Sequence, residues 1–485
     1  MLRRCSASRY LLVLIVFPLI TAIYWLSTIG RLPKIMSKPQ HHTLAPVSTT
    51  LADFLATTKA QYLKDVRSGN GKAEGWTVVM GNEAGDLDSL ASSVAFSWLR
   101  THVSNQPTIS LIQMNGEDLN LRAENMYALS LAGVSRPKDD LLFISDLSEF
   151  HPFPSSKFAL VDHNRLAPIF VPAEFPSIVA VVDHHADEGL YEDTADPRLI
   201  APSGSCASHV FTLLEAAKSE PPPELATLLL SAILIDTDGL KPGGKAIDID
   251  RKAAAFLAPK STIASLLQSQ GFVSSNDTAS TASADSLFKS GVIQSLTEDL
   301  STKKNDVFHL GPRDLLRRDY KEYDFTLSWH ASKPTVRAGL STVPVKLRDW
   351  AVDGKLEAEG EAWMKERGLH ILGVLTAYRG AKKGKRKREM AWIVRTDSPP
   401  SYSSPDGDEF DFDVLAERLW GGLETDQILE AKEHKKFANG TIKSVKKSFP
   451  HLRVRVYTQN PQATRKVTAP ALKAIVETLG VNGTV

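Results

Sequence analysis

The chain from 76 to 257 alternates short apolar runs with longer stretches in which apolar residues recur at helical spacing. A short apolar run bounded by polar residues is typical of a buried strand, whereas helical spacing predicts a helix. We predict strands at 76–80, 158–161, 178–182 and 232–235, and helices at 51–67, 89–99, 117–132, 205–217 and 223–234. Strands that alternate with helices indicate an α/β fold with a parallel sheet.

The second half of the chain predicts another, smaller α/β region. Residues 265–283 are rich in Ser, Thr, Ala and Gln, which is typical of a linker or surface loop, and a helix is expected at 284–303. Further strands are expected at 326–329, 336–341, 369–378, 390–395 and 452–457. The predicted parts are a membrane anchor at 1–36, a tether and helix at 37–70, a catalytic domain at 71–258, a linker and helix at 259–303, and a substrate-binding domain at 304–485.

Residues 11–29 form an uncharged apolar stretch of about the length that crosses a bilayer as a helix. Basic residues flank this stretch on both sides, so the positive-inside rule selects no orientation. These residues are Arg3, Arg4, Arg9, Arg31, Lys34 and Lys38. We predict an uncleaved N-terminal transmembrane helix, and hence a single-pass membrane-anchored protein. A cleaved signal peptide is the alternative for the segment, and a cytoplasmic protein is the alternative for the location.

Composition narrows the classes of partner and of metal site. The chain carries 57 Lys and Arg against 56 Asp and Glu, a balance that does not favour a nucleic-acid partner. It has only two cysteines, Cys5 and Cys206, which excludes a disulfide framework and a cysteine zinc site. Any metal must therefore be held by oxygen and imidazole ligands. No oligomeric state is predicted.

Clusters of aspartate and histidine follow the predicted strands. They are Asp86-Leu87-Asp88-Ser89, Asp162-His163-Asn164, Asp183-His184-His185 and the single residue Asp236. Loops at the carboxyl ends of parallel strands converge on one crevice, so these side chains are expected to lie together. Buried carboxylates need cations to offset their desolvation. The pattern predicts a divalent metal site suited to phosphate chemistry.

Each cluster also has a structural interpretation. Asp86 and Ser89 stand at a predicted helix start, where such residues cap the helix, and Gly81 and Gly85 permit a tight turn before it. Asp183 is placed to orient one of the two histidines that follow it. Carboxylate and imidazole ligands suit Mn²⁺ or Mg²⁺, and also Co²⁺, and two such ions form a clamp for phosphoryl displacement.

With these motifs the chain resembles the DHH-family phosphoesterases, and among them the fungal-type exopolyphosphatases. The related family II inorganic pyrophosphatases carry His-x-x-x-Asp-x-Asp, where this chain has Asn82-Glu83-Ala84-Gly85-Asp86-Leu87-Asp88. The resemblance implies two divalent cations. It assigns Asp86 to the first cation, Asp88, His184 and Asp236 to the second, and Asp162 to a bridge between them. It also implies that Asn82 replaces a histidine ligand and that His185 meets the phosphate as a candidate acid.

The second region resembles the DHHA2 domain that closes over such a site. Asp319-Tyr320-Lys321-Glu322-Tyr323 is similar to its lysine motif, which implies that Lys321 contacts substrate phosphate. The segment 463–470 is similar to a Ser-Arg-Lys motif and implies phosphate binding by Arg465 and Lys466. Arg122 resembles a basic position in the exopolyphosphatases. The alternative for Lys321, Arg465 and Lys466 is that each is an ordinary surface cation without a functional role.

The asparagine at 82 favours one branch of the family. An amide oxygen is a poorer ligand than imidazole, and the fungal exopolyphosphatases resemble this chain in carrying asparagine there. We therefore expect an exopolyphosphatase that acts on inorganic polyphosphate. The alternatives are an inorganic pyrophosphatase, a prune-like cyclic-nucleotide phosphodiesterase, and a membrane-tethered polyphosphate-binding protein without activity. The basic run 380–388 is either a solvated hairpin or a polyanion-binding loop.

Overall fold

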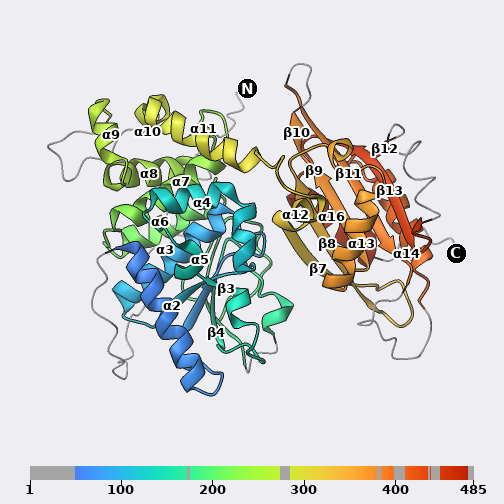
Figure 1. Cartoon of the computed structure of the whole chain (residues 1–485), viewed down its shortest axis with the longest axis horizontal. Coiled ribbons are helices and arrows are strands. Elements are labelled where there is room, and N and C mark those ends of the chain that lie inside the picture. Colours follow the sequence, from blue (N-terminus) through green and yellow to red (C-terminus); the bar gives the residue numbers. More distant parts are fainter. Residues whose placement is uncertain are drawn as a thin grey trace, which may run out of the picture.

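The computed structural model describes residues 50–171, 175–272, 284–379, 384–397, 410–434, 437 and 448–478. None of the helices within these ranges is long and apolar enough to cross a membrane. The anchor predicted at 11–29 lies outside the described residues, so it stays a prediction. The described chain forms two α/β domains that lie side by side (Figure 1).

The first domain contains a six-stranded sheet in the order β3-β2-β1-β4-β5-β6, and all of its strand pairs are parallel. The strands are β1 (Thr77–Met80), β2 (Thr108–Ile112), β3 (Leu142–Phe143), β4 (Lys157–Val161), β5 (Ser177–Asp183) and β6 (Arg198–Ile200). This confirms the predicted parallel sheet and the strands at 76–80, 158–161 and 178–182. The strand order reverses between β1 and β4, since β2 and β3 lie on one side of β1 while β4, β5 and β6 lie on the other. In such folds ligands bind at the carboxyl ends of the strands at this point.

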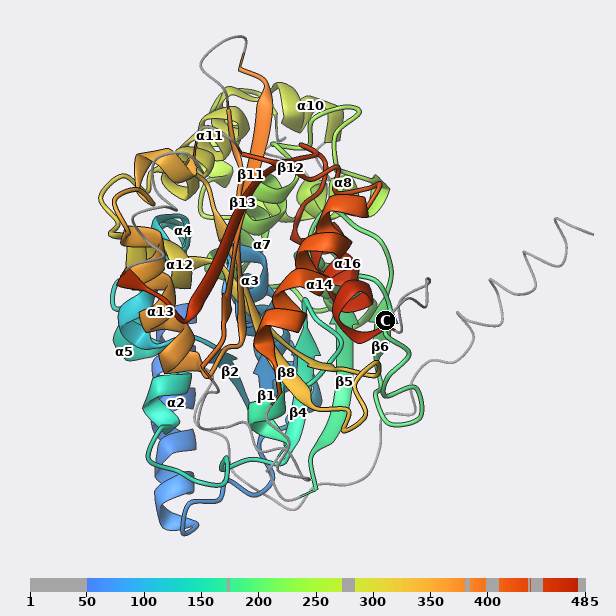
Figure 2. The ribbon, with the colours of Figure 1, turned by 90° about the vertical axis from the view of Figure 1, so that its right-hand side faces the viewer.

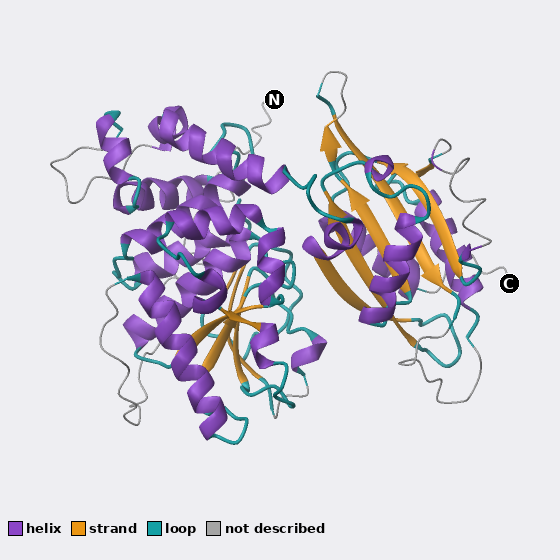
Figure 3. Ribbon diagram, viewed as in Figure 1, coloured by secondary structure: helices purple, strands orange, loops and turns teal. Residues whose placement is uncertain are grey.

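Helices surround this sheet, as the purple ribbons of Figure 3 show. They include α2 (Leu51–Ser68), α3 (Leu87–Ser104), α4 (Ala123–Leu131), α5 (Pro137–Asp140), α6 (Cys206–Ala216), α7 (Pro223–Asp236), α8 (Asp248–Leu257), α9 (Ala264–Ser269), α10 (Ala284–Lys289) and α11 (Gly291–Asn305). Short 3-10 helices lie at η1 (Gly116–Leu121), η2 (Ile144–Leu147), η3 (Pro168–Phe170) and η4 (Ala258–Lys260). The helices predicted at 117–132 and 284–303 are each divided in two.

The strand predicted at 232–235 is wrong, because these residues form the last turns of helix α7. Every residue of α7 from Leu225 to Leu234 is buried, and α7 packs against α3, α4, α6, α8 and α11. A helix surrounded by other helices is apolar on all faces, so a short piece of it has the same pattern as a buried strand. Asp236 therefore ends a helix and not a strand.

The second domain has a mixed sheet in the order β12-β13-β11-β9-β8-β7, with β10 paired to β11. Its strands are β7 (Tyr320–Thr326), β8 (Thr335–Val343), β9 (Ile371–Thr376), β10 (Tyr378–Arg379), β11 (Arg386–Arg395), β12 (Lys432–Glu433) and β13 (Leu452–Gln459). The β8–β9 pair is parallel and the others are antiparallel. The strand predicted at 326–329 is displaced, since β7 ends at 326.

The helices of the second domain cover both faces of this sheet. They are α12 (Pro312–Arg318), η5 (Leu347–Asp349), α13 (Lys355–Arg367), α14 (Phe412–Thr425) and α16 (Arg465–Glu477). Figure 2 shows α12 and α13 on one side of the strands and α14 and α16 on the other. Two separate apolar cores follow from this arrangement, one around Trp363 and Leu372 and one around Trp392 and Leu419.

Gly81 links β1 to the loop that precedes α3. A Cβ atom at this position would lie 2.6 Å from the Cβ of Ser89 and 2.7 Å from its carbonyl oxygen. Glycine therefore allows the first turn of α3 to lie against the end of β1. The next glycine of the loop, Gly85, has φ +58°, the left-handed conformation that glycine adopts without strain.

We expect Gly81→Ala to lower the free energy of unfolding by about 1–3 kcal/mol, because the added methyl group overlaps the backbone of α3. Gly421→Ala is the matched control, since Gly421 lies inside helix α14 with no neighbouring atom within 4 Å of an added Cβ. There alanine should be neutral or stabilising by up to about 1 kcal/mol. Urea denaturation measures both variants, and equal effects would contradict the close approach.

Candidate metal centre

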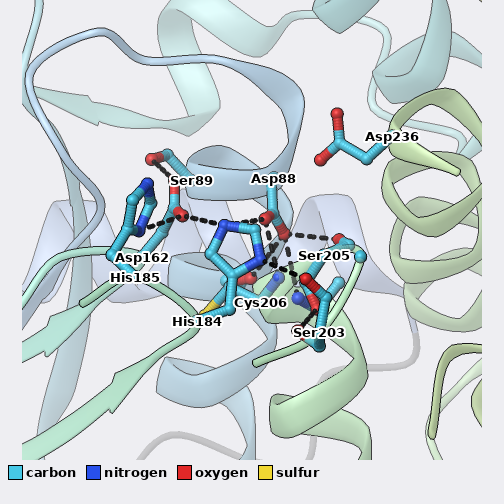
Figure 4. A network of polar contacts seen from close by, with 12 residues as sticks. Asp88, Ser89, Asp162, His184, His185, Ser203, Ser205, Cys206 and Asp236 are labelled. Atoms are coloured by element: carbon cyan, nitrogen blue, oxygen red, sulfur yellow. Dashed lines mark hydrogen bonds and ion pairs between the residues drawn. The ribbon is translucent and has the colours of Figure 1, made fainter. Parts of the chain in front are cut away.

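The candidate site lies at the carboxyl ends of β1, β4 and β5, where the strand order of the sheet reverses. The loop after β1 carries Asn82, Asp162 follows β4, and the two histidines follow β5. Figure 4 shows how these side chains point toward one another, with the ring of His184 between the carboxylates of Asp88 and Asp162. The strand-end convergence predicted from the sequence is therefore present for three of the four motifs.

Asp162 is the centre of the cluster. It is 2% exposed, and its backbone has φ +60°, a conformation that non-glycine residues adopt uncommonly. Its Oδ2 accepts hydrogen bonds from Nδ2 of Asn82 at 2.7 Å and from Oγ of Ser89 at 2.6 Å. Its Oδ1 is buried and has no hydrogen-bond partner among the described residues. One carboxylate oxygen is thus held in place while the other is directed into the site.

His184 faces this unbonded oxygen. Its Nε2 lies 3.3 Å from Oδ1 of Asp162 and 3.9 Å from Oδ2 of Asp88. Its Nδ1 lies 3.1 Å from the carbonyl oxygen of Ser203, to which it donates as an N–H. This is the arrangement of a metal-binding histidine, whose second nitrogen is commonly fixed by a carbonyl group. Burial lowers the pKa of His184, but contact with Asp162 and the charges of Asp88 and Asp162 outweigh burial and raise the pKa to about 9.

His185 is held by the aspartate that begins its motif. Its Nδ1 lies 2.7 Å from Oδ1 of Asp183, and the backbone N–H groups of His184 and His185 donate to the same oxygen. The other oxygen of Asp183 accepts from Nδ2 of Asn164 at 2.6 Å. These bonds fix the ring so that its Nε2 is available for a ligand. Of the two histidines, Asp183 therefore orients His185.

Asp88 is buried against the start of helix α6. Its carboxylate accepts hydrogen bonds from Oγ of Ser205 at 2.7 Å and from the backbone N–H groups of Cys206 at 2.7 Å and Ala207 at 2.9 Å. The start of a helix favours a negative charge in this position. Burial and the charges of Asp162 and Asp236 nevertheless raise the pKa of Asp88 well above its ordinary value. A nearby cation would relieve this repulsion.

Asn82 occupies the position at which the resemblance implied a ligand. Its Oδ1 accepts from the backbone N–H of Ala84 at 2.9 Å, and its Nδ2 donates to both the carbonyl oxygen and Oδ2 of Asp162. The reversed amide orientation would place its oxygen against two acceptors, so these contacts determine the orientation. Asn82 therefore presents its amino group to Asp162, a geometry that favours a positioning role over metal ligation.

Asp86 and Asp236 lie at the edge of the cluster. The side chain of Asp86 caps α3 by accepting from the N–H of Ser89 at 3.1 Å, so the capping interpretation is confirmed. Asp236 stands apart from the other carboxylates in Figure 4, and its Oδ1 lies 3.8 Å from Nζ of Lys304. Burial raises the pKa of Asp236, as does the charge of Asp86, while Lys304 opposes this.

The donor set fits a divalent cation. Ligand atoms of Asp162, His184 and His185 all lie within 4.8 Å of one another. The buried Oδ1 of Asp162 needs a partner, and a cation is the partner that also reduces the repulsion among the surrounding carboxylates. Oxygen and imidazole ligands suit Mn²⁺, Co²⁺ or Mg²⁺.

The second domain contributes cations to this site. Lys321 is the second residue of β7 and its charge lowers the pKa of Asp162, while Lys466 is exposed at the start of α16 and its charge lowers the pKa of His184. That these two lysines contact substrate phosphate stays a prediction. Arg465 differs, because its guanidinium binds Oδ1 of Asp319 at 2.8 Å and the Asp319 carbonyl oxygen at 3.1 Å.

Arg122 is not a surface cation. Its side chain is 2% exposed and donates to the carbonyl oxygen of Ala84 in the loop after β1. Sequence analysis gave no role to its partner Glu124 or to Lys304, because neither belongs to a motif with a chemical signature. It included Ser89 and Asn164 within the aspartate clusters but did not predict their hydrogen bonds to Asp162 and Asp183.

Comparisons with known proteins identify the family of the chain. Residues 76–233 match the DHH family, N-terminal domain, and residues 298–475 match the DHHA2 domain. The chain is 31% identical over 302 residues to the "Putative exopolyphosphatase" of Schizosaccharomyces pombe, an alignment that covers 59% of this chain and 70% of that protein.

Two shorter alignments cover less than two thirds of the relative. The chain is 31% identical to "Exopolyphosphatase PRUNE1" of Mus musculus, over 39% of this chain and 42% of that protein. It is 29% identical to the "Probable manganese-dependent inorganic pyrophosphatase" of Streptococcus equi subsp. zooepidemicus, over 34% of this chain and 49% of that protein.

We expect Mn²⁺ to raise the Tm of the protein, by roughly 5 °C or more at a concentration far above the dissociation constant, because the cation binds only the folded state. The Asp162→Asn variant should show little of this increase in Tm, since the substitution removes the negative charge of the central candidate ligand. Asp187→Asn is the matched control, because Asp187 is an exposed carboxylate two residues beyond His185. An equal Tm rise in Asp162→Asn would show that the cation binds elsewhere.

Proposed function

The chain belongs to the DHH family, and on this premise we propose that it is a metal-dependent exopolyphosphatase, which hydrolyses the terminal phosphoanhydride bond of inorganic polyphosphate. Water attacks the terminal phosphorus, and the products are orthophosphate and a chain shorter by one phosphate. One observation carries the proposal: the buried Oδ1 of Asp162, which makes no hydrogen bond, faces Nε2 of His184 at 3.3 Å and Nδ1 of His185 at 3.6 Å at the carboxyl end of the parallel sheet.

We assign the metal-binding role to Asp162, His184 and Asp88, with Asp86 and Asp236 at the edge of the site. Divalent cations bound there, Mn²⁺ or Mg²⁺, would supply charge neutralisation and activation of water. Asn82 supports the site by holding Oδ2 of Asp162. This assignment changes the role that the resemblance implied for Asn82, from a weak ligand to a positioning residue.

The remaining residues of the proposed site act on the substrate. His185, fixed by Asp183, presents its Nε2 to the phosphate and can donate a proton to the departing oxygen. Lys321 and Lys466 bring positive charge from the second domain to the transferring phosphoryl group. Arg465 contributes through the guanidinium nitrogens that Asp319 does not occupy.

Phosphate release from pyrophosphate, tripolyphosphate and long-chain polyphosphate in the presence of Mn²⁺ tests this function. We expect faster turnover on tripolyphosphate and longer chains than on pyrophosphate, and a loss of at least about a hundredfold in Asp162→Ala. Asp413→Ala, which removes an exposed carboxylate of the second domain, serves as the control that retains activity.

The same assay separates the alternatives. Activity on pyrophosphate alone would replace the proposal with an inorganic pyrophosphatase, the activity printed in the name of the streptococcal relative. Release of a nucleoside monophosphate from cyclic nucleotides would indicate a phosphodiesterase. Metal binding and polyphosphate binding without turnover would indicate a binding protein.

A basic hairpin provides a second test of chain-length preference. Lys385, Arg386 and Lys387 are exposed where β10 and β11 project beyond the second domain (Figure 1). We propose that this hairpin attracts the distant part of a long polyanion. Replacing all three by Gln should raise KM for long chains about tenfold, from three contacts of roughly 0.5 kcal/mol each, and leave tripolyphosphate unaffected.

The control for this variant removes the same charge elsewhere. Arg136, Lys252 and Lys473 are exposed and scattered over the described surface, so their triple Gln variant should leave both KM values unchanged. Steady-state kinetics at low salt measure the effect, because salt screens exposed charges. A rise in KM for tripolyphosphate as well would place the hairpin effect at the active site and contradict long-chain guidance.

A further inference from the structure

The two domains meet through a set of four charges, three of them buried and the fourth, Asp319, 23% exposed, which we call the interdomain charge junction. The first domain contributes Arg122 and Glu124, and the second contributes the adjacent residues Arg318 and Asp319. Each acidic side chain faces an arginine of the other domain. The junction lies beside the metal-site loop, although none of its four side chains belongs to the cluster of candidate metal ligands.

Arg318 reaches from the second domain into the first. Its Nη2 lies 3.1 Å from both carboxylate oxygens of Glu124, and its Nε donates to the carbonyl oxygen of Leu121 at 2.8 Å. It also donates to the carbonyl oxygen of Lys304, at the end of α11, at 2.8 Å. The side chains of Arg318 and Glu124 are 4% and 1% exposed, so almost no water shares these bonds.

Arg122 connects the junction to the metal-site loop. It donates to the carbonyl oxygen of Ala84, between Asn82 and Asp86, and its Nη2 lies 3.7 Å from Oδ1 of Asp319. The same oxygen of Asp319 binds Nη1 of Arg465 at 2.8 Å. A continuous series of polar contacts therefore runs from the loop after β1, across the domain boundary, to the start of helix α16.

The charge order of the junction allows one alignment of the domains. Arg318 and Asp319 are neighbours of opposite charge, and so are the positions that face them. Arg122 and Glu124 also contact each other at 3.4 Å within the first domain, so an arrangement that exchanged the two interdomain pairs would set Arg318 against Arg122 and Asp319 against Glu124. Like charges buried in contact are strongly unfavourable, so the junction selects against displaced arrangements.

We propose that Glu124 and Arg318 are positioning residues that hold the second domain over the metal site and thereby place Lys321 and Arg465 against the substrate. Both residues act through others, since neither belongs to the candidate ligand cluster. The kinetic part of this proposal rests on the proposed function, whereas its structural part does not. The junction therefore predicts two separate observables, the arrangement of the domains and the affinity for substrate.

The test uses the full chain with Glu124→Gln, Arg318→Met and the double variant. Small-angle X-ray scattering should show a larger radius of gyration for each single variant, because the buried ion pair across the domain boundary is lost and the interface opens. KM for tripolyphosphate should rise at least about tenfold with a smaller change in kcat. In the double variant the effects should be less than additive, as expected for residues that act on each other.

Arg317→Met is the matched control. Arg317 also crosses the domain boundary, with Nη1 3.1 Å from Oδ1 of Asp118, but its side chain is 31% exposed, so its loss should change neither the scattering nor KM. Arg318→Lys, which keeps the charge but cannot reach all four acceptors, provides a milder variant if Arg318→Met does not fold.

The outcomes separate the two proposals. Folded Glu124→Gln and Arg318→Lys variants with the scattering curve of Arg317→Met would overturn the positioning role. Open variants of a chain whose wild-type form releases no phosphate from any substrate would support the junction and contradict the proposed function. An unchanged arrangement with altered KM would also overturn the proposal, because the effect would then not pass through the domains.

Discussion

The repulsion among buried carboxylates is the constraint on which the site depends. Asp88, Asp162 and Asp183 are each at most 2% exposed and lie at one edge of the sheet. The fold gives each a different source of positive potential: Asp88 has the start of helix α6, Asp162 has Asn82, Ser89 and His184, and Asp183 has Asn164 and His185. The inward oxygen of Asp162 makes no hydrogen bond and has Nε2 of His184 as a neighbour at 3.3 Å, and a divalent cation is the group that would complete its coordination.

Much of the first domain could be predicted from apolar patterning, because three of its strands are mostly buried apolar runs followed closely by polar residues. Strand β2 was missed because it carries Thr108 and Ser110, both buried, whose polarity hides a core position. Helix α7 gave a false strand for the opposite reason, since a helix buried on every side loses its periodicity. A short run of apolar residues therefore indicates burial more reliably than it indicates whether the run is a helix or a strand.

The sequence allowed us to predict which residues gather at the strand ends. It did not allow us to predict which hydrogen-bond partner a given side chain takes. Asp162, Asp88 and the two histidines follow from the parallel sheet and its direction. The amide of Asn82 turns toward Asp162 because a nearby N–H occupies its oxygen, and the sequence carries no sign of that choice. From the sequence alone Arg122 resembles a surface cation, whereas in the structure it is buried and donates to the carbonyl oxygen of Ala84.

The second domain is related to the site by the same electrostatic interaction, the attraction of cations to the buried carboxylates. Its lysines approach a site of excess negative charge, which attracts them but does not by itself fix their position, because charge attraction has little directional preference. The interdomain charge junction supplies direction, since the bonds of Arg318 to Glu124, Leu121 and Lys304 are short, buried and geometrically specific. Attraction brings the domains together, and the buried hydrogen bonds decide how they meet. The affinity for a phosphate chain then depends on residues that never contact it.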